Sequence, residues 1–233
     1  MTDPSSSSYA EIFDDPAHAA DYRDGPARFM PGYGAMQRMA GVLLRERVGA
    51  KGDIFVHGAG GGAEIEAFAR ENAEWRFLGV EPAKAMLDEA AKNLQPLGPR
   101  VSFHHGYAED APVGPFDGAT SLLTLHFIEP EARRDTVGHL VRRLKPGAPF
   151  ICAHVSFPQN SGDRDVWLDR HQAFSTASGM DPALAAEGRG VIADEIYALD
   201  PATDERILRD AGLRDVTAFY AAFTWRGWVG YAP

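Results

Sequence analysis

The sequence predicts an α/β protein with a doubly wound, mostly parallel β-sheet, and three observations lead to this prediction. Short apolar runs alternate at least four times with Ala- and Glu-rich helical runs, which is the rhythm of βαβ units. The first apolar run, 53–57, leads directly into the glycine cluster 58–62. Two β-rich runs within 216–231 indicate an antiparallel hairpin at the end of the sheet.

The individual elements follow from periodicity and from turn residues. Strands are expected at 53–57, 75–80, 101–105, 116–125 and 150–155, and the closing hairpin would bring the sheet to seven strands. Helices are expected at about 36–48, 63–72, 82–94, 131–144 and 203–211. Because crossovers between parallel strands are right-handed, the helices should cover both faces of this Rossmann-like sheet.

The expected organisation is one domain, 50–233, preceded by an N-terminal helical segment, 9–49, and a disordered polar tail, 1–8. The βα rhythm stops at residues 158–200, which are polar and punctuated by Gly and Pro. Helical runs within this stretch, at 166–175, 182–186 and 191–198, predict a helical cap insertion.

Composition excludes several classes of function. A net charge of −10 without a clustered Lys/Arg stripe argues against nucleic acid as a partner. No run approaches the roughly 18 apolar residues of a membrane helix, so no membrane partner is expected. One cysteine, Cys152, falls in an apolar run and is expected in a buried strand, which suits a cytoplasmic location. No His/Cys/Asp cluster has metal-ligand spacing, so no metal is expected.

The glycine cluster points to a nucleoside. Gly58, Gly60 and Gly62 allow a tight turn and a close backbone approach to a ligand. Glu81 ends the second strand, where a carboxylate can accept hydrogen bonds from both ribose hydroxyls. The glycine pattern alone also satisfies the dinucleotide fingerprint. A long helical preamble, a short chain and a terminal hairpin in place of a second mononucleotide half favour a different adenosine cofactor.

Five motifs in a fixed order narrow this expectation. They are VHGAGGG at 56–62, GVEP at 79–82 with Met86 and Leu87, GYAE at 106–109, the run 116–126, and LKPG at 144–147. Through them the chain resembles class I S-adenosylmethionine (SAM)-dependent methyltransferases over roughly residues 20–231. Within that family, the segments 28–33, 127–130 and 211–216 are most similar to carboxy-SAM synthases and small-molecule methyltransferases.

The resemblance implies SAM as the cofactor and a set of residues that contact it. Glu81 would hold the ribose, the backbone at 58–60 would face the methionine part, and Met86 would pack on the adenine. The complete expected set is Tyr22, Arg28, Tyr33, His57, Gly58, Ala59, Gly60, Glu81, Pro82, Met86, Ala108, Glu109 and Leu122. Two positions depart from the family, which usually carries an acidic residue at Val56 and an aspartate at Tyr107.

Methyl transfer requires mainly that the acceptor be aligned, and a base is needed only if the acceptor loses a proton. His126, at the end of the fourth strand, is the candidate base, with a packed structural histidine as the alternative. Trp167, His171 and Arg189 in the cap are candidates for substrate contacts, with core and surface roles as alternatives. The resemblance to carboxy-SAM synthases implies an arginine for a carboxylate at Arg189.

The sequence is compatible with three functions. The first is a SAM-dependent methyltransferase that acts on a small molecule. The second is a carboxy-SAM synthase-like enzyme, and the third is a SAM-binding protein without catalysis. The expected partner is a small-molecule substrate, and the assembly is left open between a monomer and a homodimer.

Overall fold

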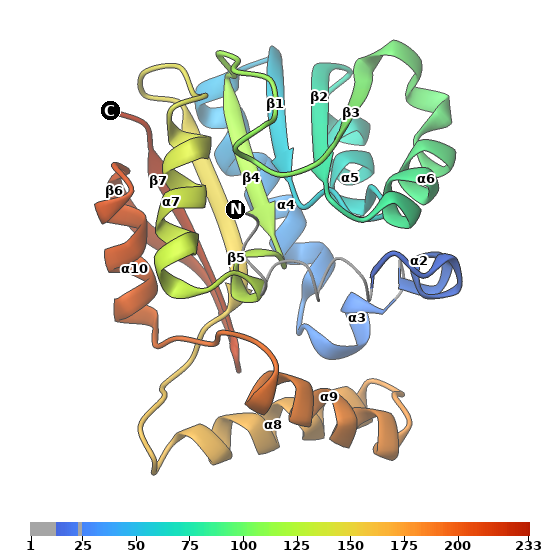
Figure 1. Ribbon diagram of the computed structural model, residues 1–233, viewed down its shortest axis with the longest axis vertical. Coiled ribbons are helices and arrows are strands. Elements are labelled where there is room, and N and C mark those ends of the chain that lie inside the picture. The colour runs from blue at the N-terminus through green and yellow to red at the C-terminus, as the bar shows by residue number, and fades with distance from the viewer. Residues whose placement is uncertain (1–12, 23–24) are drawn as a thin grey trace.

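A computed structural model describes residues 13–22 and 25–233, and its centre is a seven-stranded sheet with helices on both faces (Figure 1). The strand order is β3-β2-β1-β4-β5-β7-β6. The first five strands pair in parallel, and β7 runs antiparallel to both of its neighbours. The predicted fold, a Rossmann-like α/β sheet closed by a C-terminal hairpin, is confirmed. The predicted disordered tail, 1–8, lies outside the described residues.

The strands have the following bounds: β1 Lys51–His57, β2 Glu74–Glu81, β3 Val101–His105, β4 Gly118–Leu122, β5 Pro149–Val155, β6 Arg214–Ala222 and β7 Trp225–Tyr231. The α-helices are α2 Pro16–Tyr22, α3 Pro26–Phe29, α4 Tyr33–Val48, α5 Ala63–Glu71, α6 Lys84–Asn93, α7 Pro130–Val141, α8 Arg164–Ala177, α9 Pro182–Asp194 and α10 Pro201–Asp210. Two short 3₁₀ helices complete the order, η1 Gln95–Arg100 and η2 Leu125–Phe127.

The sheet separates two hydrophobic cores. Side chains alternate along a strand, so Ile54 and Val56 of β1 face one core while Phe55 faces the other. Helices α4 and α5 close the first core, and α7 and α10 close the second. All seven residues of β5 are buried, as expected for a central strand covered on both sides.

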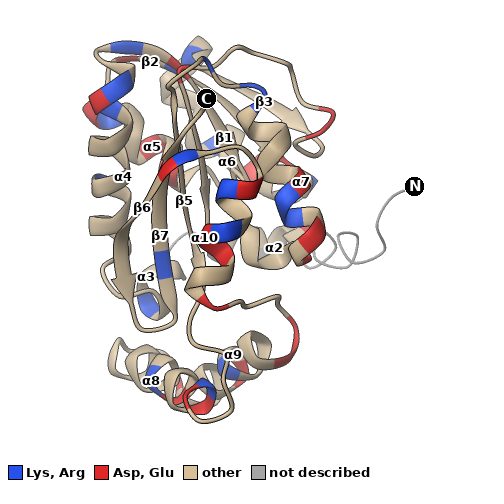
Figure 2. Ribbon diagram, turned by 90° about the vertical axis from the view of Figure 1, so that its left-hand side faces the viewer, with Lys and Arg blue, Asp and Glu red and all other residues tan. Residues whose placement is uncertain are grey.

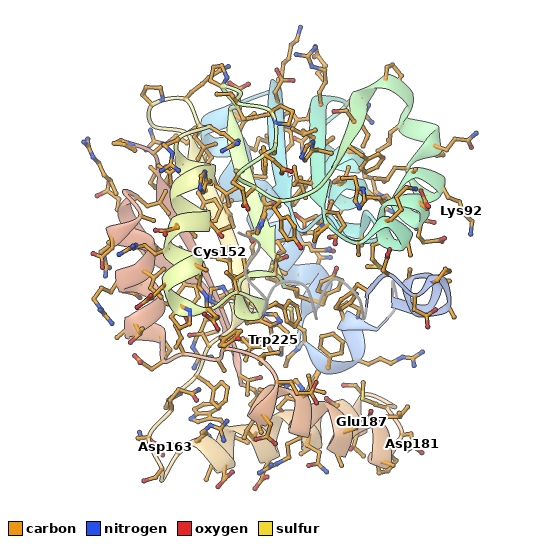
Figure 3. The ribbon with its side chains drawn as sticks, viewed as in Figure 1. Lys92, Cys152, Asp163, Asp181, Glu187 and Trp225 are labelled. Carbon is orange, nitrogen blue, oxygen red and sulfur yellow. The ribbon has the colours of Figure 1, made fainter. Side chains whose placement is uncertain are left out.

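The cysteine prediction is confirmed. Cys152 is fully buried in the middle of β5 (Figure 3), where burial raises the pKa of its thiol. No helix in the described part of the chain is both long and apolar enough to cross a bilayer. Figure 2 shows acidic and basic residues interspersed along α8, α9 and α10.

The fourth strand is shorter than predicted, Gly118–Leu122 instead of 116–125. Phe116 forms only an isolated bridge to Leu144. At the other end, Leu123 takes a left-handed backbone conformation with φ of 60° and donates its N–H to the Ala153 carbonyl. The chain then turns into η2, so apolar composition alone overestimated the strand.

The cap forms two helices where three helical runs were predicted. Helices α8 and α9 pack together beyond the end of the sheet, beside α3 (Figure 1). The predicted runs 182–186 and 191–198 form parts of one helix, α9, which continues through Gly188 and Gly190 and ends at Asp194. A glycine inside a helix costs about 1 kcal/mol relative to alanine, which the other contacts of a helix can offset. Asp181 caps the start of α9 by accepting hydrogen bonds from Ala183 N and Leu184 N.

The C-terminal hairpin holds the N-terminal segment. The Tyr220 hydroxyl donates to the Pro31 carbonyl, and Trp225 Nε1 donates to the Phe29 carbonyl at 3.2 Å. The Trp225 and Phe29 rings also stack, with centroids 5.8 Å apart. Figure 3 shows Trp225 between the end of the sheet and the cap helices.

A buried ion pair joins α7 to α10. Arg133 Nη1 donates to Asp204 Oδ1 at 2.6 Å, and both side chains are 1% exposed. His154 Nε2 lies 3.2 Å from the same carboxylate oxygen. Arg133 also donates to the carbonyls of Ile128 and Tyr197, so it fastens the segment that follows the cap.

Removing one partner of this pair should be strongly destabilising, because the other charge would stay buried without compensation. We expect Asp204→Ala to lower the free energy of unfolding by about 3–5 kcal/mol, measured by urea denaturation at pH 7. The control is Asp88→Ala, which breaks the exposed pair with Lys84 on α6 and should cost under about 1 kcal/mol. Equal losses in the two variants would contradict the role assigned to Asp204.

Candidate functional site

A cavity of about 420 Å³ opens where the parallel strands end. Its walls come from the loops after β1, β2, β3 and β4, from one side of α7, and from the N-terminal segment at Phe13, Pro26 and Tyr33. The size is that of a small-molecule or cofactor site. The carboxyl edge of a parallel sheet, beside the first strand, is also where α/β folds bind nucleotides.

The loop after β1 is fixed to the end of β2. The Val80 carbonyl accepts two hydrogen bonds, from Gly58 N at 2.9 Å and from Ala59 N at 3.1 Å. Gly58 has φ of 70°, and a Cβ there would lie 2.1 Å from Thr124 Oγ1. Only glycine therefore permits this turn to pass so close to the segment after β4.

Glu81 holds the same loop from the other side. Its Oε2 accepts from Gly60 N at 3.0 Å, and its Oε1 accepts from Ala83 N at 3.1 Å. Burial raises the pKa of this carboxyl, and the two backbone hydrogen bonds act in the opposite direction. The carboxylate lines the cavity at the end of β2, where the sequence predicted a ribose contact.

Glu64, in the first turn of α5, is a second buried carboxyl in the cavity wall. Its side chain is buried, and its Oε1 accepts a hydrogen bond from Thr120 Oγ1 at 2.5 Å. Burial raises the pKa of Glu64 to about 8, although the Thr120 hydroxyl lowers it. The sequence prediction missed this residue because an acid in the first turn of a helix is ordinary. The missed signal is its place beside the buried Ile65 and Phe68 of the same helix.

His57 lines the cavity from the end of β1. Its Nδ1 is 2.9 Å from Ser121 Oγ, and burial lowers its pKa to about 4. The ring is therefore neutral at pH 7 and adds no positive charge to the cavity.

Most of the predicted cofactor residues are brought together here. Those that line the cavity are Tyr33, His57, Gly58, Ala59, Gly60, Glu81, Pro82, Met86, Ala108, Glu109 and Leu122. Arg28 does not line it and is exposed on α3. Tyr22 is the last residue of α2, and its side chain lies outside the described part of the structure.

The wall formed by α7 and by the segment before it was not predicted. It contributes apolar and polar side chains, namely Phe127, Ile128, Glu129, Ala132, Asp135, Thr136 and His139. Part of this stretch, 127–130, resembled the family in sequence, but only the packing of α7 shows which of its faces meets the cavity. Tyr107, noted as a departure from the family, also lines the cavity.

His126 lies behind the cavity wall and is not among its lining residues. Its side chain is buried, its Nδ1 accepts from Val155 N at 3.3 Å, and its ring packs edge-on to Trp225. Burial is the largest cause that holds the pKa of His126 well below its ordinary value, and electrostatic repulsion by His154 and Arg133 acts in the same direction. This position suits the alternative of a packed core histidine, and we assign no base role to His126.

The three predicted substrate residues lie in the cap, away from the cavity lining. His171 is buried and pairs with Thr224 Oγ1 at 3.0 Å, while Trp167 packs against Arg170 and Arg226. Arg189 forms ion pairs with two aspartates of α8, at 2.9 Å and 3.2 Å. Arg189, which the resemblance implied would bind the carboxylate of a ligand, therefore pairs with carboxylates of the cap itself.

The charge of the cavity is acidic. Its described lining holds five carboxyl groups and two histidines, and no lysine or arginine; the carboxyl groups are those of Glu64, Glu81, Glu109, Glu129 and Asp135. No cluster of three or more His, Cys, Asp or Glu side chains suited to a metal ion occurs among the described residues. Such a lining attracts a ligand with net positive charge and repels a pyrophosphate.

Comparison with known proteins agrees with this geometry. Residues 54–147 match the sequence profile of a methyltransferase domain family. Over this stretch the chain is similar to class I SAM-dependent methyltransferases. The matched stretch runs from β1 to the turn before β5, so it includes the glycine loop, Glu81 and the wall formed by α7. SAM binding is typical of this family.

The relatives are distant. Carboxy-S-adenosyl-L-methionine synthase of Campylobacter lari is 18% identical over 213 residues, which are 91% of each chain. In structure, the 1,6-didemethyltoxoflavin-N1-methyltransferase of Burkholderia thailandensis, with bound S-adenosylhomocysteine, is similar with a TM-score of 0.66 and 18% identity, covering 100% of this chain and 91% of that one. Magnesium protoporphyrin IX methyltransferase from Synechocystis PCC 6803, with bound SAM, is similar with a TM-score of 0.59 and 15% identity. The match covers 87% of this chain and 80% of that one. These likenesses support the fold.

The close approach at Gly58 gives a direct test of the loop geometry. We expect Gly58→Ala to lower the free energy of unfolding by about 1–3 kcal/mol, because the new Cβ would require Thr124 to move and the backbone to stay left-handed. Urea denaturation measures the change. Gly49→Ala is a matched control, since Gly49 also has positive φ but a Cβ there meets nothing within 4 Å. A loss at Gly58 no larger than at Gly49 would contradict the steric argument.

Proposed function

We propose that this protein is a SAM-dependent methyltransferase that acts on a small-molecule acceptor. The observation that carries the proposal is the Glu81 carboxylate, which faces the cavity at the end of β2 and also holds the glycine loop through Gly60 N. A carboxylate in this place can accept hydrogen bonds from two ribose hydroxyls, and the loop lets the rest of the cofactor approach the backbone closely. The residues present therefore fit an adenosine cofactor.

The acidic lining favours SAM over a dinucleotide. SAM carries a net positive charge at neutral pH, from its sulfonium and amino groups and one carboxylate. A dinucleotide carries two negative phosphates, and no described lysine or arginine in the lining would compensate their charge. The same lining supports an acceptor that is neutral or cationic.

When bound, SAM would supply an activated methyl group for in-line transfer to a nucleophilic atom. The task of the protein is then to bind, orient and exclude water. Glu81 and the loop at 58–60 would hold the cofactor, and Met86 and Ala108 offer apolar surface for its adenine. Phe13, Pro26 and Tyr33 would cover the cavity from the N-terminal side and keep solvent out.

A second candidate is a carboxy-SAM synthase-like enzyme, because relatives of that name match nearly the whole chain. That function would require recognition of an acidic donor, for which a positively charged side chain is the usual partner. Arg189, the predicted partner, is paired with Asp165 and Asp169 on the cap. The geometry therefore supports methyl transfer more strongly.

The ligand that remains bound after purification distinguishes the two candidates. We expect mass spectrometry of the denatured protein to find SAM or S-adenosylhomocysteine. A carboxylated SAM would instead support the second candidate and overturn the first. Buffer-exchanged protein reloaded with SAM serves as the reference for extraction.

The ribose assignment is tested by Glu81→Ala. We expect SAM affinity to fall by roughly 1–3 kcal/mol, because charge-assisted hydrogen bonds to the ribose are lost. Isothermal titration calorimetry with SAM and with S-adenosylhomocysteine measures the change, and Asp88→Ala on the exposed side of α6 is the control. Unchanged affinity would remove Glu81 from the site. No heat from the wild type with either ligand would remove the SAM proposal itself.

A further inference from the structure

Glu64 is the buried group in the cavity that the proposed function has not used. Its side chain is 6% exposed, yet it lines the cavity rather than packing into the core. One carboxyl oxygen accepts from Thr120 Oγ1. The other oxygen accepts no hydrogen bond within the described part of the chain. Because this oxygen is not among the fully buried atoms without a partner, it is open to the cavity, where a ligand can bind it.

The Glu64 carboxyl lies against the face of the sheet formed by β1 and β4. Val56 and Thr120 are register partners on the parallel strands β1 and β4, so their side chains project from the same face of the sheet. Because Thr120 binds Glu64, the Glu64 carboxyl lies on that face, close to the Val56 side chain. Helix α5 therefore brings a carboxyl to a face of the sheet where β1 contributes only the apolar Val56.

On these grounds, and resting on the proposed use of SAM, we propose that Glu64 binds the amino group of the methionine part of the cofactor. The group is held beside the glycine loop, on the side of the cavity expected to receive the methionine part. An ammonium group donates up to three hydrogen bonds, and the unused carboxyl oxygen of Glu64 is an acceptor for one of them.

Binding of the amino group by Glu64 should be coupled to loss of a proton. Burial raises the pKa of Glu64 to about 8 without ligand, so the carboxyl is mostly protonated at pH 7. A cation beside it favours the charged form, so binding should release a proton. The affinity should therefore rise with pH up to about 8 and then level off. The other carboxyl and imidazole groups that line the cavity are those of His57, Glu81, Glu109, Glu129, Asp135 and His139, and the phenols of Tyr33 and Tyr107 also line it.

Ligand-free stability gives a readout that is independent of activity. Because the pKa of Glu64 is higher in the folded protein, its protonated side chain stabilises the fold at pH values below its ordinary pKa of 4.5. This stabilisation is lost as the pH rises to about 8. The isosteric Glu64→Gln variant cannot ionise. Its melting temperature without ligand should therefore exceed that of the wild type at pH 8, and the difference should shrink toward pH 5.

The deciding experiment is calorimetric titration of the wild type and Glu64→Gln with SAM and S-adenosylhomocysteine from pH 6 to pH 9. At pH 8 the variant should bind both ligands about 10- to 100-fold more weakly, because both carry the amino group. Its affinity should also lack the rise with pH seen in the wild type. The matched control is Glu66→Gln, which changes the same charge on the same helix but outside the cavity lining. This control should bind and titrate as the wild type does.

Each alternative result overturns a defined part of the argument. If the wild type binds SAM and Glu64→Gln binds both ligands equally well with the same pH profile, the role of Glu64 is refuted while the proposed function stands. A loss confined to SAM refutes the assignment to the amino group and identifies the sulfonium as the partner. If the wild type binds neither ligand, the proposed function fails, and the inference fails with it.

Discussion

The cavity depends on one bridging carboxylate. Glu81 accepts one hydrogen bond from the glycine loop and one from the start of α6, so it fixes three chain segments that meet at the end of β2. The Val80 carbonyl also accepts hydrogen bonds from Gly58 N and Ala59 N, which adds a second connection between the glycine loop and the end of β2. A ligand that binds here meets a loop already held in place, which reduces the ordering cost of binding.

A carboxyl lies beside the glycine loop although the adjacent strand β1 carries no acid at that level. Val56 leaves β1 without an acid, and its neighbour across the strands, Thr120, orients a carboxyl that comes from α5. The packing of helix α5, rather than the register of β1, determines where this carboxyl lies. The carboxyl is mostly protonated at pH 7, and a cation beside it would favour the ionised form.

The sequence predicted the sheet well because each strand is a short apolar run bounded by turn residues, and because the glycine cluster follows β1 directly. Most of the residues predicted to contact a cofactor line one cavity, because they follow the ends of neighbouring parallel strands. Glu64 and the face of α7 were missed because their exposure to the cavity depends on how helices pack. The end of β4 was misplaced because the left-handed turn at Leu123 is invisible in an apolar run. His126 was predicted at the end of this strand, but it lies in η2, and its ring packs against Trp225 instead of lining the cavity.

The attachment of the N-terminal segment to the last hairpin has a consequence for biosynthesis. Phe29 and Pro31 bind Trp225 and Tyr220, groups separated from them by more than 180 positions along the chain. Sheet strands β1 to β5 can pair as the ribosome delivers them, but the segment that carries Pro26 and Tyr33 gains its anchor only after β6 and β7 have been synthesised. A nascent chain would thus lack the N-terminal wall of the cavity until Tyr220 and Trp225 have emerged. The cavity is therefore completed only after the hairpin has formed, although most of its wall comes from segments synthesised much earlier.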